Sequence, residues 1–273
     1  MTAYSTFRDV VEHTKERRID FFRLIFGDES GYVCIAYKSH LDKSMREKFF
    51  HYPSQLSEMC DDVDNNSLTL THVYFCPQLF KDDKYKRGDG KGPRVKENVR
   101  ICPTLWADLD TCNPQLLQVP ASIVVQSSKG RWQAFWRMDQ ALQPEEAEAI
   151  CMKIAYFHSE QGADRSGWDL TQLLRVPYTP NYKYGDAKTA PVVTVITTTS
   201  ALYRPSDFSV YPQYGSLKFV DDPMPLPSDL PQEAAIDILQ RYRSGLNPQV
   251  FSLFGTELDD SDVWSKVQWK LAK

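Results

Sequence analysis

The chain has 273 residues, of which 42% are hydrophobic and 12% aromatic, so it can bury a sizeable core in one large domain or two small ones. Its formal net charge of -4 and pI near 5.8 exclude a protein that attracts polyanions through its overall charge, so any nucleic-acid site must be a local basic patch. No stretch reaches the roughly 20 apolar residues of a membrane span, and the polar start lacks the apolar core of a signal peptide. We therefore expect a cytoplasmic protein with no membrane partner.

The first part of the chain predicts two helices, two strands and a basic loop. Residues 5–27 have helical periodicity, and "GYVCIAYKS" at 31–39 is strand-like. The polar segment 41–66 also reads as helical, and the β-branched and aromatic residues of 67–80 predict a second strand. Residues 81–98, "KDDKYKRGDGKGPRVKEN", form a loop dense in lysine, arginine and glycine, which is the first local basic patch.

Strands and helices are interspersed in the next part. "VRICPTLWADLD" at 99–110 predicts a strand, and 121–138 predicts two strands joined at the "SSKGR" turn. Residues 143–163 begin with proline and acidic residues and end at a glycine, as a helix does, and 191–203 predicts a further strand. This order of elements predicts an α+β fold.

The composition changes after Tyr211. We expect a first domain at residues 1–211, a proline-rich linker at 212–230 and a small helical segment at 231–273. The last residues, "DVWSKVQWKLAK", continue a helical pattern without a capping signal, which suggests a fragment of a longer protein.

The six cysteines favour reduced thiols over a zinc site. They are scattered, without a CxxC pair or a cluster of zinc-finger spacing. His72 and Cys76 in "THVYFC" would share a strand face, but that pair does not supply the other ligands. We expect no zinc.

Two aspartates lie one residue apart at the end of a predicted strand. Because side chains two positions apart face the same side, Asp108 and Asp110 would present carboxylates about 7 Å apart. Hard ions such as Mg²⁺ and Mn²⁺ take oxygen ligands, and two of them about 4 Å apart can promote phosphoryl or nucleotidyl transfer. Aspartates also commonly end strands, so the motif alone leaves both interpretations open.

Two neighbouring segments add groups that can contact phosphate. "SSKGR" places hydroxyl, ammonium and guanidinium groups around a glycine that lets the backbone approach an anion, although an ordinary solvated turn has the same composition. "WDLTQLLRVPYTPNYK" adds Asp169, followed by Arg175 and Lys183. Asp164, slightly upstream, is an alternative third carboxylate, or a residue that caps or turns the chain after Gly162.

In this order and spacing, "LWADLD", "SSKGRWQAFWRM" and "DLTQLLRVPYTPNYK" resemble the three motifs of the archaeo-eukaryotic primase superfamily, particularly RepB-type plasmid primases and phage primase-polymerases. The resemblance covers roughly residues 74–183. It implies an RRM-like core of mixed or antiparallel sheets flanked by helices. It also implies a nucleotidyltransferase that makes or extends primers on single-stranded DNA in phage or plasmid replication, with nucleoside triphosphates as substrates and a helicase domain after residue 273.

The resemblance assigns roles to the motif residues. Three carboxylates, Asp108, Asp110 and Asp169, would be catalytic and would hold two Mg²⁺ or Mn²⁺ ions. The nucleotide-binding residues would be Ser128, Lys129, Arg131, Gln133, Arg175 and Lys183. In the basic loop, Lys91, Arg94 and Lys96 would follow the phosphates of the template.

Two positions depart from the family pattern. Gln133 stands where much of the superfamily has a histidine that contacts the triphosphate, and an amide can donate to a phosphate oxygen but carries no charge. Tyr178 stands where the third motif usually has glycine, so we expect a turn of different shape.

Two other functions fit the same residues. A metal-dependent nuclease would use the carboxylates but would not need a basic surround of triphosphate size. A catalytically silent module would bind single-stranded DNA or an origin, and its acidic residues would only end strands.

Overall fold

A computed structural model of the chain describes residues 7–67, 69–86, 92–186 and 188–212, with only the backbone described for 7–13. The chain divides into two compact units, Met1–Gly215 and Ser216–Lys273. The second unit lies outside the described residues. The predicted linker, apart from Pro212, and the predicted helical segment at 231–273 lie outside them as well and stay predictions.

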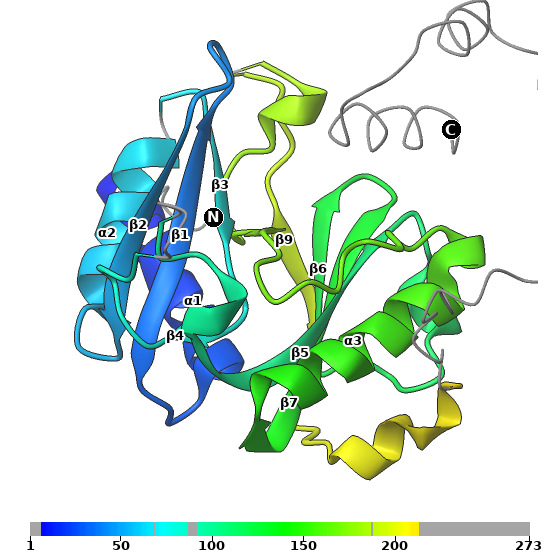
Figure 1. The fold of residues 1–273 in the computed structure, drawn as a ribbon. Helices are drawn as coiled ribbons and strands as arrows, with labels where there is room; N and C mark the ends of the chain where they lie inside the picture. Colours follow the sequence, from blue (N-terminus) through cyan, green and yellow to red (C-terminus); the bar gives the residue numbers. More distant parts are fainter. Residues whose placement is uncertain (1–6, 68, 87–91, 187, 213–273) are drawn as a thin grey trace, which may run out of the picture. The chain divides into compact units, whose positions relative to one another are not determined.

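The described residues form three α-helices and nine strands (Figure 1). The helices are α1 (Phe7–Phe26), α2 (Leu56–Ser67) and α3 (Pro144–His158). The strands are β1 (Gly31–Ser39), β2 (Met45–Tyr52), β3 (Thr71–Phe75), β4 (Leu79–Phe80), β5 (Val99–Asp110), β6 (Ile123–Ser128), β7 (Arg131–Leu142), β8 (Leu174–Arg175) and β9 (Thr194–Thr198). Within the described residues, and outside 41–66, each predicted helix and strand is present with bounds close to those expected. The predicted strand at 67–80 is divided into β3 and β4.

The helix predicted over 41–66 is wrong in its first half. The structure has β2 there, antiparallel to β1, and α2 begins only at Leu56. Phe50 and Tyr52 of β2 are buried on either side of the half-exposed His51, which is the period of a strand. The start of β2 is polar and exposed, so its pairing with β1, rather than its own hydrophobic pattern, decides its structure.

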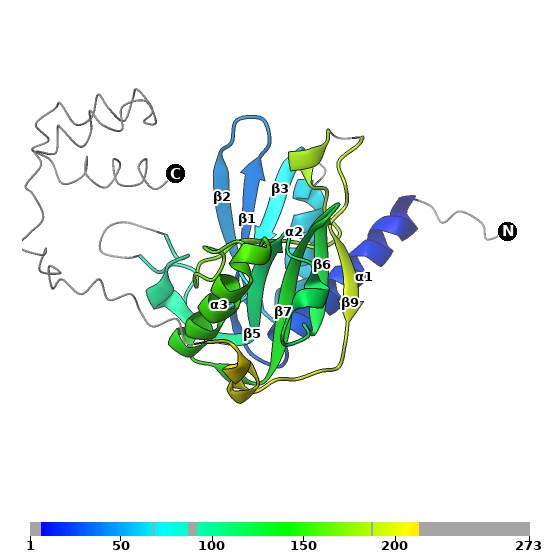
Figure 2. The same ribbon diagram turned by 90° about the vertical axis from the view of Figure 1, so that its right-hand side faces the viewer.

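The strands form one sheet in the order β8-β3-β1-β4-β5-β7-β6-β9, with β2 on the other edge of β1, and every strand pair is antiparallel. The short β4 joins an N-terminal half of the sheet (β1, β2, β3, β8) to a C-terminal half (β5, β6, β7, β9). Figures 1 and 2 show α2 against the N-terminal half and α3 alongside β5, and α1 contacts α2, β5 and β7. The predicted α+β class is therefore confirmed. No helix in the described ranges is long and apolar enough to cross a membrane.

Aromatic side chains link α1 to both halves of the sheet. Phe21 of α1 packs edge-on against Phe75 of β3 and Phe135 of β7, with ring centroids 5.5 and 5.9 Å apart. Phe75 and Phe135 also contact each other, at 6.0 Å. All three rings are buried, so this cluster adds both hydrophobic stabilisation and ring-to-ring contacts where the two halves of the sheet meet.

A fully buried arginine of α1 holds the turn that follows β8. Arg18 donates to the backbone oxygens of Pro177 and Tyr178, at 3.3 and 3.0 Å, and pairs with Asp64 of α2 at 2.7 Å. Tyr178 has a φ of 63°, a left-handed conformation that favours glycine, and the Arg17 guanidinium lies 4.5 Å from its ring centroid. Tyr178 thus has a backbone conformation that glycine favours, at the position where the resembled motif usually has glycine, and the expected difference in turn shape stays a prediction.

Replacing Arg18 by methionine should destabilise the protein strongly, because it leaves the two carbonyls and Asp64 without their donor. We expect a loss of about 3–5 kcal/mol in the free energy of unfolding, measured by urea denaturation. The control is Arg23→Met on the same helix, which removes an exposed pair with Asp20 and should change little. Equal effects of the two substitutions would contradict a structural role for Arg18.

Candidate active site

The two aspartates of the first motif lie at the end of β5. Asp108 is opposite Gln133 of β7 and Asp110 is opposite Trp132, with a shift of register between them. Asp110 ends the strand with a φ of 44°, and its backbone N–H donates to Asp108 Oδ1 at 3.4 Å. The irregular strand end keeps both carboxylates on the same side, as the spacing predicted.

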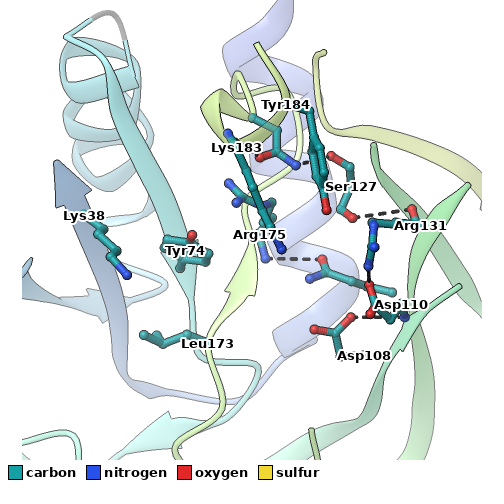
Figure 3. A pocket seen from close by; sticks show the side chains of 12 residues that line it. Lys38, Tyr74, Asp108, Asp110, Ser127, Arg131, Leu173, Arg175, Lys183 and Tyr184 are labelled. Atoms are coloured by element: carbon teal, nitrogen blue, oxygen red, sulfur yellow. Dashed lines mark hydrogen bonds and ion pairs between the residues drawn. The ribbon is translucent and has the colours of Figure 1, made fainter. Parts of the chain in front are cut away.

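Both carboxylates line a pocket of about 330 Å³ between the two halves of the sheet (Figure 3). This volume lies at the lower end of the range for small-molecule sites. The lining residues are Lys38 and Tyr74 from the N-terminal half, Asp108, Asp110, Ser127, Arg131 and Gln133 from the C-terminal half, Leu173, Arg175, Asn181 and Lys183 from the third motif, and Tyr184 directly after it. Six predicted site residues meet here: Asp108, Asp110, Arg131, Gln133, Arg175 and Lys183.

The two carboxylates have different electrostatic surroundings. Asp110 forms an ion pair with Arg131 of β7. Asp108 has no ion-pair partner among the described side chains. Burial and, next, the carboxylate of Asp164 raise the pKa of Asp108 to about 6, although the nearby cations of the pocket oppose this shift. The ionised form of Asp108 is therefore one that an added cation would stabilise.

Arg175 is the most buried cation of the pocket, with 8% of its surface exposed. Its guanidinium lies 4.8 Å from the ring centroid of Tyr74, and its Nη1 is 3.2 Å from Nδ1 of His72. Within the described residues, no carboxylate forms an ion pair with Arg175, Lys38 or Lys183. The pocket therefore offers three cations that an anionic ligand can use.

Gln133 is a buried lining residue of the pocket and its amide is oriented by one hydrogen bond. The backbone N–H of Arg175 donates to Gln133 Oε1 at 3.2 Å, and the residue is 3% exposed. Because the carbonyl oxygen already accepts, the amide NH₂ is the group left to donate to a ligand.

The turn of the second motif presents a different serine from the one predicted. Ser127 lines the pocket, and its hydroxyl donates to the Arg131 carbonyl at 3.4 Å. Ser128 is buried outside the lining, and Lys129 is exposed beyond it. The register of β6 against β7 shifts between Gln126 and Ser128, and such a shift changes which side chains face one side of a sheet.

The structure does not bring Asp169 into the pocket. Its Oδ2 forms an ion pair with Lys96 at 3.0 Å, and its Oδ1 accepts from the backbone N–H of Thr171 at 2.7 Å. Burial by itself would raise the pKa of Asp169, but the Thr171 hydrogen bonds and Lys96 lower it. Lys96 also pairs with Glu148 of α3 at 2.5 Å. A predicted metal ligand and a predicted template-binding lysine are thus partners of each other.

Asp164 lies closer to the aspartate pair. Its backbone N–H donates to the Asp108 carbonyl at 2.9 Å, and its carboxylate contributes to the raised pKa of Asp108. Gly167 permits this approach, because a Cβ at that position would lie 3.1 Å from the Asp108 Cβ. Among the residues that the structure describes, however, no three His, Cys, Asp or Glu side chains are grouped so that they could hold a metal ion.

The predicted template-binding residues have separate surroundings. Lys91 lies outside the described residues. Arg94 pairs with Glu47 of β2 at 2.6 Å and donates to the Thr171 carbonyl at 2.8 Å. Together with the Lys96 contacts, these bonds fasten the basic loop to β2, α3 and the third motif. Neither Arg94 nor Lys96 lines the pocket.

Sequence reasoning did not assign six of the lining residues to the site: Lys38, Tyr74, Ser127, Leu173, Asn181 and Tyr184. Lys38 is the first charge after the buried run of β1, a signal too common to mark a site. Tyr74 belongs to a strand that looks like ordinary core. Only the pairing of β3 with β8 places Tyr74 directly opposite Arg175.

No protein-family model and no curated protein sequence matches the chain. Solved structures do match. The catalytic domain of primase RepB' in complex with initiator DNA has a TM-score of 0.53 at 15% identity, covering 72% of this chain and 93% of that one. A second structure, of primase RepB', has a TM-score of 0.52 at 15% identity and covers 72% and 62%. The AEP domain of the cyanophage S-2L primase-polymerase has a TM-score of 0.51 at 12% identity and covers 72% and 98%.

The chain has the fold of a primase catalytic domain. At these identities the likeness shows the fold alone, and the fold is the one that the three sequence motifs implied. The pocket at the end of β5 is therefore the candidate active site of a primase fold.

Replacing Asp108 by asparagine should stabilise the metal-free primase fold at neutral pH. The pKa of Asp108 is raised from 3.8 to about 6, so ionising this side chain is harder in the folded than in the unfolded protein. The wild-type protein therefore loses stability as the pH rises from 3.8 through 6, and this loss is absent below 3.8. Since the side chain is only half-buried, we expect a gain of about 1–2 kcal/mol at pH 7.5 and little at pH 4.5. Urea denaturation with a chelator at both pH values measures it. The control is Asp139→Asn, which changes an exposed residue of β7 away from the pocket. An equal gain from Asp108→Asn at both pH values would exclude a charge effect.

Proposed function

We propose that the chain is the catalytic domain of a primase-polymerase, which adds nucleotides on a single-stranded DNA template. The observation that carries this proposal is the pocket in which Asp108 and Asp110 face the cations Arg175 and Lys183. Two carboxylates suit a hard divalent ion, and cations beside them suit a triphosphate. The fold shared with primase structures supports the same reaction class.

The residues of the pocket fit a divalent metal. Mg²⁺ usually binds proteins through one or two carboxylates together with substrate phosphates, and Asp108 is a carboxylate with a raised pKa and no ion-pair partner among the described side chains. Asp108 and Asp110 would hold Mg²⁺ or Mn²⁺, as a two-metal site if a third carboxylate joins them. When bound, such ions lower the pKa of an attacking hydroxyl and neutralise the departing pyrophosphate.

For the third carboxylate we propose Asp164 in place of Asp169. The Asp169 oxygens are bonded to Lys96 and Thr171. Asp164 Oδ1 accepts from Ser166, but Asp164 forms no ion pair among the described side chains and acts electrostatically on Asp108. The backbone hydrogen bond from Asp164 to the Asp108 carbonyl already holds this residue beside the aspartate pair.

The remaining pocket residues suit a nucleoside triphosphate. Arg175, Lys183 and Lys38 can neutralise its phosphates without giving up an ion pair to a described carboxylate. The Gln133 NH₂ can donate to a phosphate oxygen in place of the histidine of related motifs. Charge for binding therefore comes from the N-terminal half of the sheet and the third motif rather than from Lys129.

The remaining partners follow from the same proposal. One similar primase structure is in complex with initiator DNA, which supports DNA binding here, and single-stranded DNA as the template stays a prediction. Three expectations stay predictions: that Lys91 contacts the template, that a helicase domain follows residue 273, and that the protein acts in phage or plasmid replication.

The test is incorporation of labelled ribo- and deoxynucleotides on a primer-free single-stranded template with Mg²⁺ or Mn²⁺. We expect metal-dependent products from the wild-type protein and a loss of at least about 10³-fold from Asp108→Asn with Asp110→Asn, as for other groups that act directly in catalysis. Asp139→Asn should retain full activity. Cleavage of the template without nucleotides would instead identify a nuclease. Metal-independent DNA binding without any product, even on an annealed primer, would identify a silent binding module.

The same assay distinguishes the two candidate carboxylates. We expect Asp164→Asn to reduce incorporation strongly and to raise the metal concentration needed for half-maximal rate. Asp169→Asn should mainly weaken the attachment of Lys96 and alter stability modestly, because that pair is partly exposed. If Asp169→Asn instead changes the metal dependence more than Asp164→Asn does, Asp169 is the third metal-binding carboxylate.

A further inference from the structure

We propose that His72 is a positioning residue that holds the Arg175 guanidinium in the pocket without neutralising its charge, so that the full charge is available to a polyphosphate. This inference rests on the proposed function, because it assigns how the same pocket binds its anionic substrate. His72 lies on β3, two residues before the lining residue Tyr74, and is 6% exposed.

Among the described residues, His72 is the hydrogen-bond partner of the Arg175 guanidinium. Arg175 Nη1 is 3.2 Å from His72 Nδ1, and the guanidinium lies over the ring of Tyr74. Pairing of β3 with β8 places Tyr74 opposite Arg175 and thereby brings the His72 ring, two residues away, alongside the guanidinium. No described carboxylate bonds to this guanidinium.

The geometry determines the protonation of the imidazole. Arginine only donates, so His72 Nδ1 must accept and the neutral ring carries its proton on Nε2. Nε2 is 3.3 Å from Nδ1 of His40, which can accept that proton in a hydrogen bond. Burial and then the Arg175 charge lower the pKa of His72 to about 4, which agrees with a neutral ring. The hydrogen bonds therefore run from Arg175 through His72 to the half-exposed His40.

The other buried arginine of the described chain shows the contrast. Arg18 pairs with a carboxylate, Asp64, and with two backbone carbonyls, and it serves the fold. Arg175 is almost as buried but has an imidazole in the place of the carboxylate. A neutral acceptor orients the guanidinium fork, and it does not compete with phosphate for the positive charge.

The experiment compares His72→Asn with His72→Asp, which have the same shape and differ in charge. The probe is inorganic tripolyphosphate, titrated calorimetrically into the wild-type protein and each variant at low salt. We expect His72→Asn, whose amide oxygen can accept from Arg175, to bind within about threefold of wild type. His72→Asp should bind at least about tenfold more weakly, because a buried carboxylate beside Arg175 cancels its charge.

Two further variants keep the test decisive. His72→Phe keeps an aromatic ring but has no acceptor, so it should bind more weakly than His72→Asn even if His72→Asp fails to fold. His158→Asn changes a buried histidine of α3 that contacts Gln161 and Tyr211 outside the pocket, and it should bind tripolyphosphate as wild type does. The proposal is overturned if His72→Asn and His72→Phe bind tripolyphosphate with equal affinity, or if His72→Asn and a folded His72→Asp do. It is also overturned if the wild type does not bind tripolyphosphate.

Nucleotide incorporation separates this inference from the proposed function. If this inference and the proposed function are both right, His72→Asp raises the nucleotide KM by a larger factor than it lowers kcat. His72→Asn then keeps KM and kcat close to the wild-type values. If the wild type incorporates nucleotides but His72→Asn and His72→Asp have the same KM and kcat, the primase-polymerase proposal stays intact and His72 has no role in it. Tripolyphosphate binding that follows the predicted order without incorporation would support the positioning role and count against the enzyme.

Discussion

The fold and the candidate site both depend on β5, the strand shared by the two halves of the sheet. Its first residues pair with β4, which leads to β1, and its last residues pair with β7. One continuous strand therefore fixes the position of the N-terminal half against the C-terminal half and ends in the two aspartates. The aromatic contacts of Phe21 with Phe75 and Phe135 stabilise this arrangement, because they bury rings from both halves under a single helix.

The pocket gains its chemistry from the meeting of the two halves. The acidic groups arrive at the end of β5, whereas Lys38 and Tyr74 come from β1 and β3 and Arg175 is placed by the pairing of β8 with β3. Opposite charges therefore face each other across the pocket, and they are only partly matched, since Arg131 pairs with Asp110 while Asp108 and Arg175 have no such partner in the described chain. That mismatch is the property that suits a metal ion and a triphosphate together.

Charge that is fully paired has a structural role in the same molecule. Arg94 bonds to Glu47, Lys96 bonds to Glu148 and Asp169, and Arg18 bonds to Asp64. These pairs hold the basic loop and the turn of the third motif against the sheet. The list of charged residues in a motif therefore does not reveal which of them are available to a ligand, because availability depends on partners that come from distant segments.

The sequence by itself determined the α+β class, most of the helices and strands, and the aspartate pair, because these depend on local periodicity and on spacing along one strand. Only the tertiary structure decided that residues 45–52 form a strand, that Ser127 rather than Ser128 faces the pocket, and that Asp169 is bonded to Lys96. Each of these depends on strand register or on a contact between segments far apart in the chain. A register shift of one residue reverses the direction of every side chain, and local patterns do not encode it.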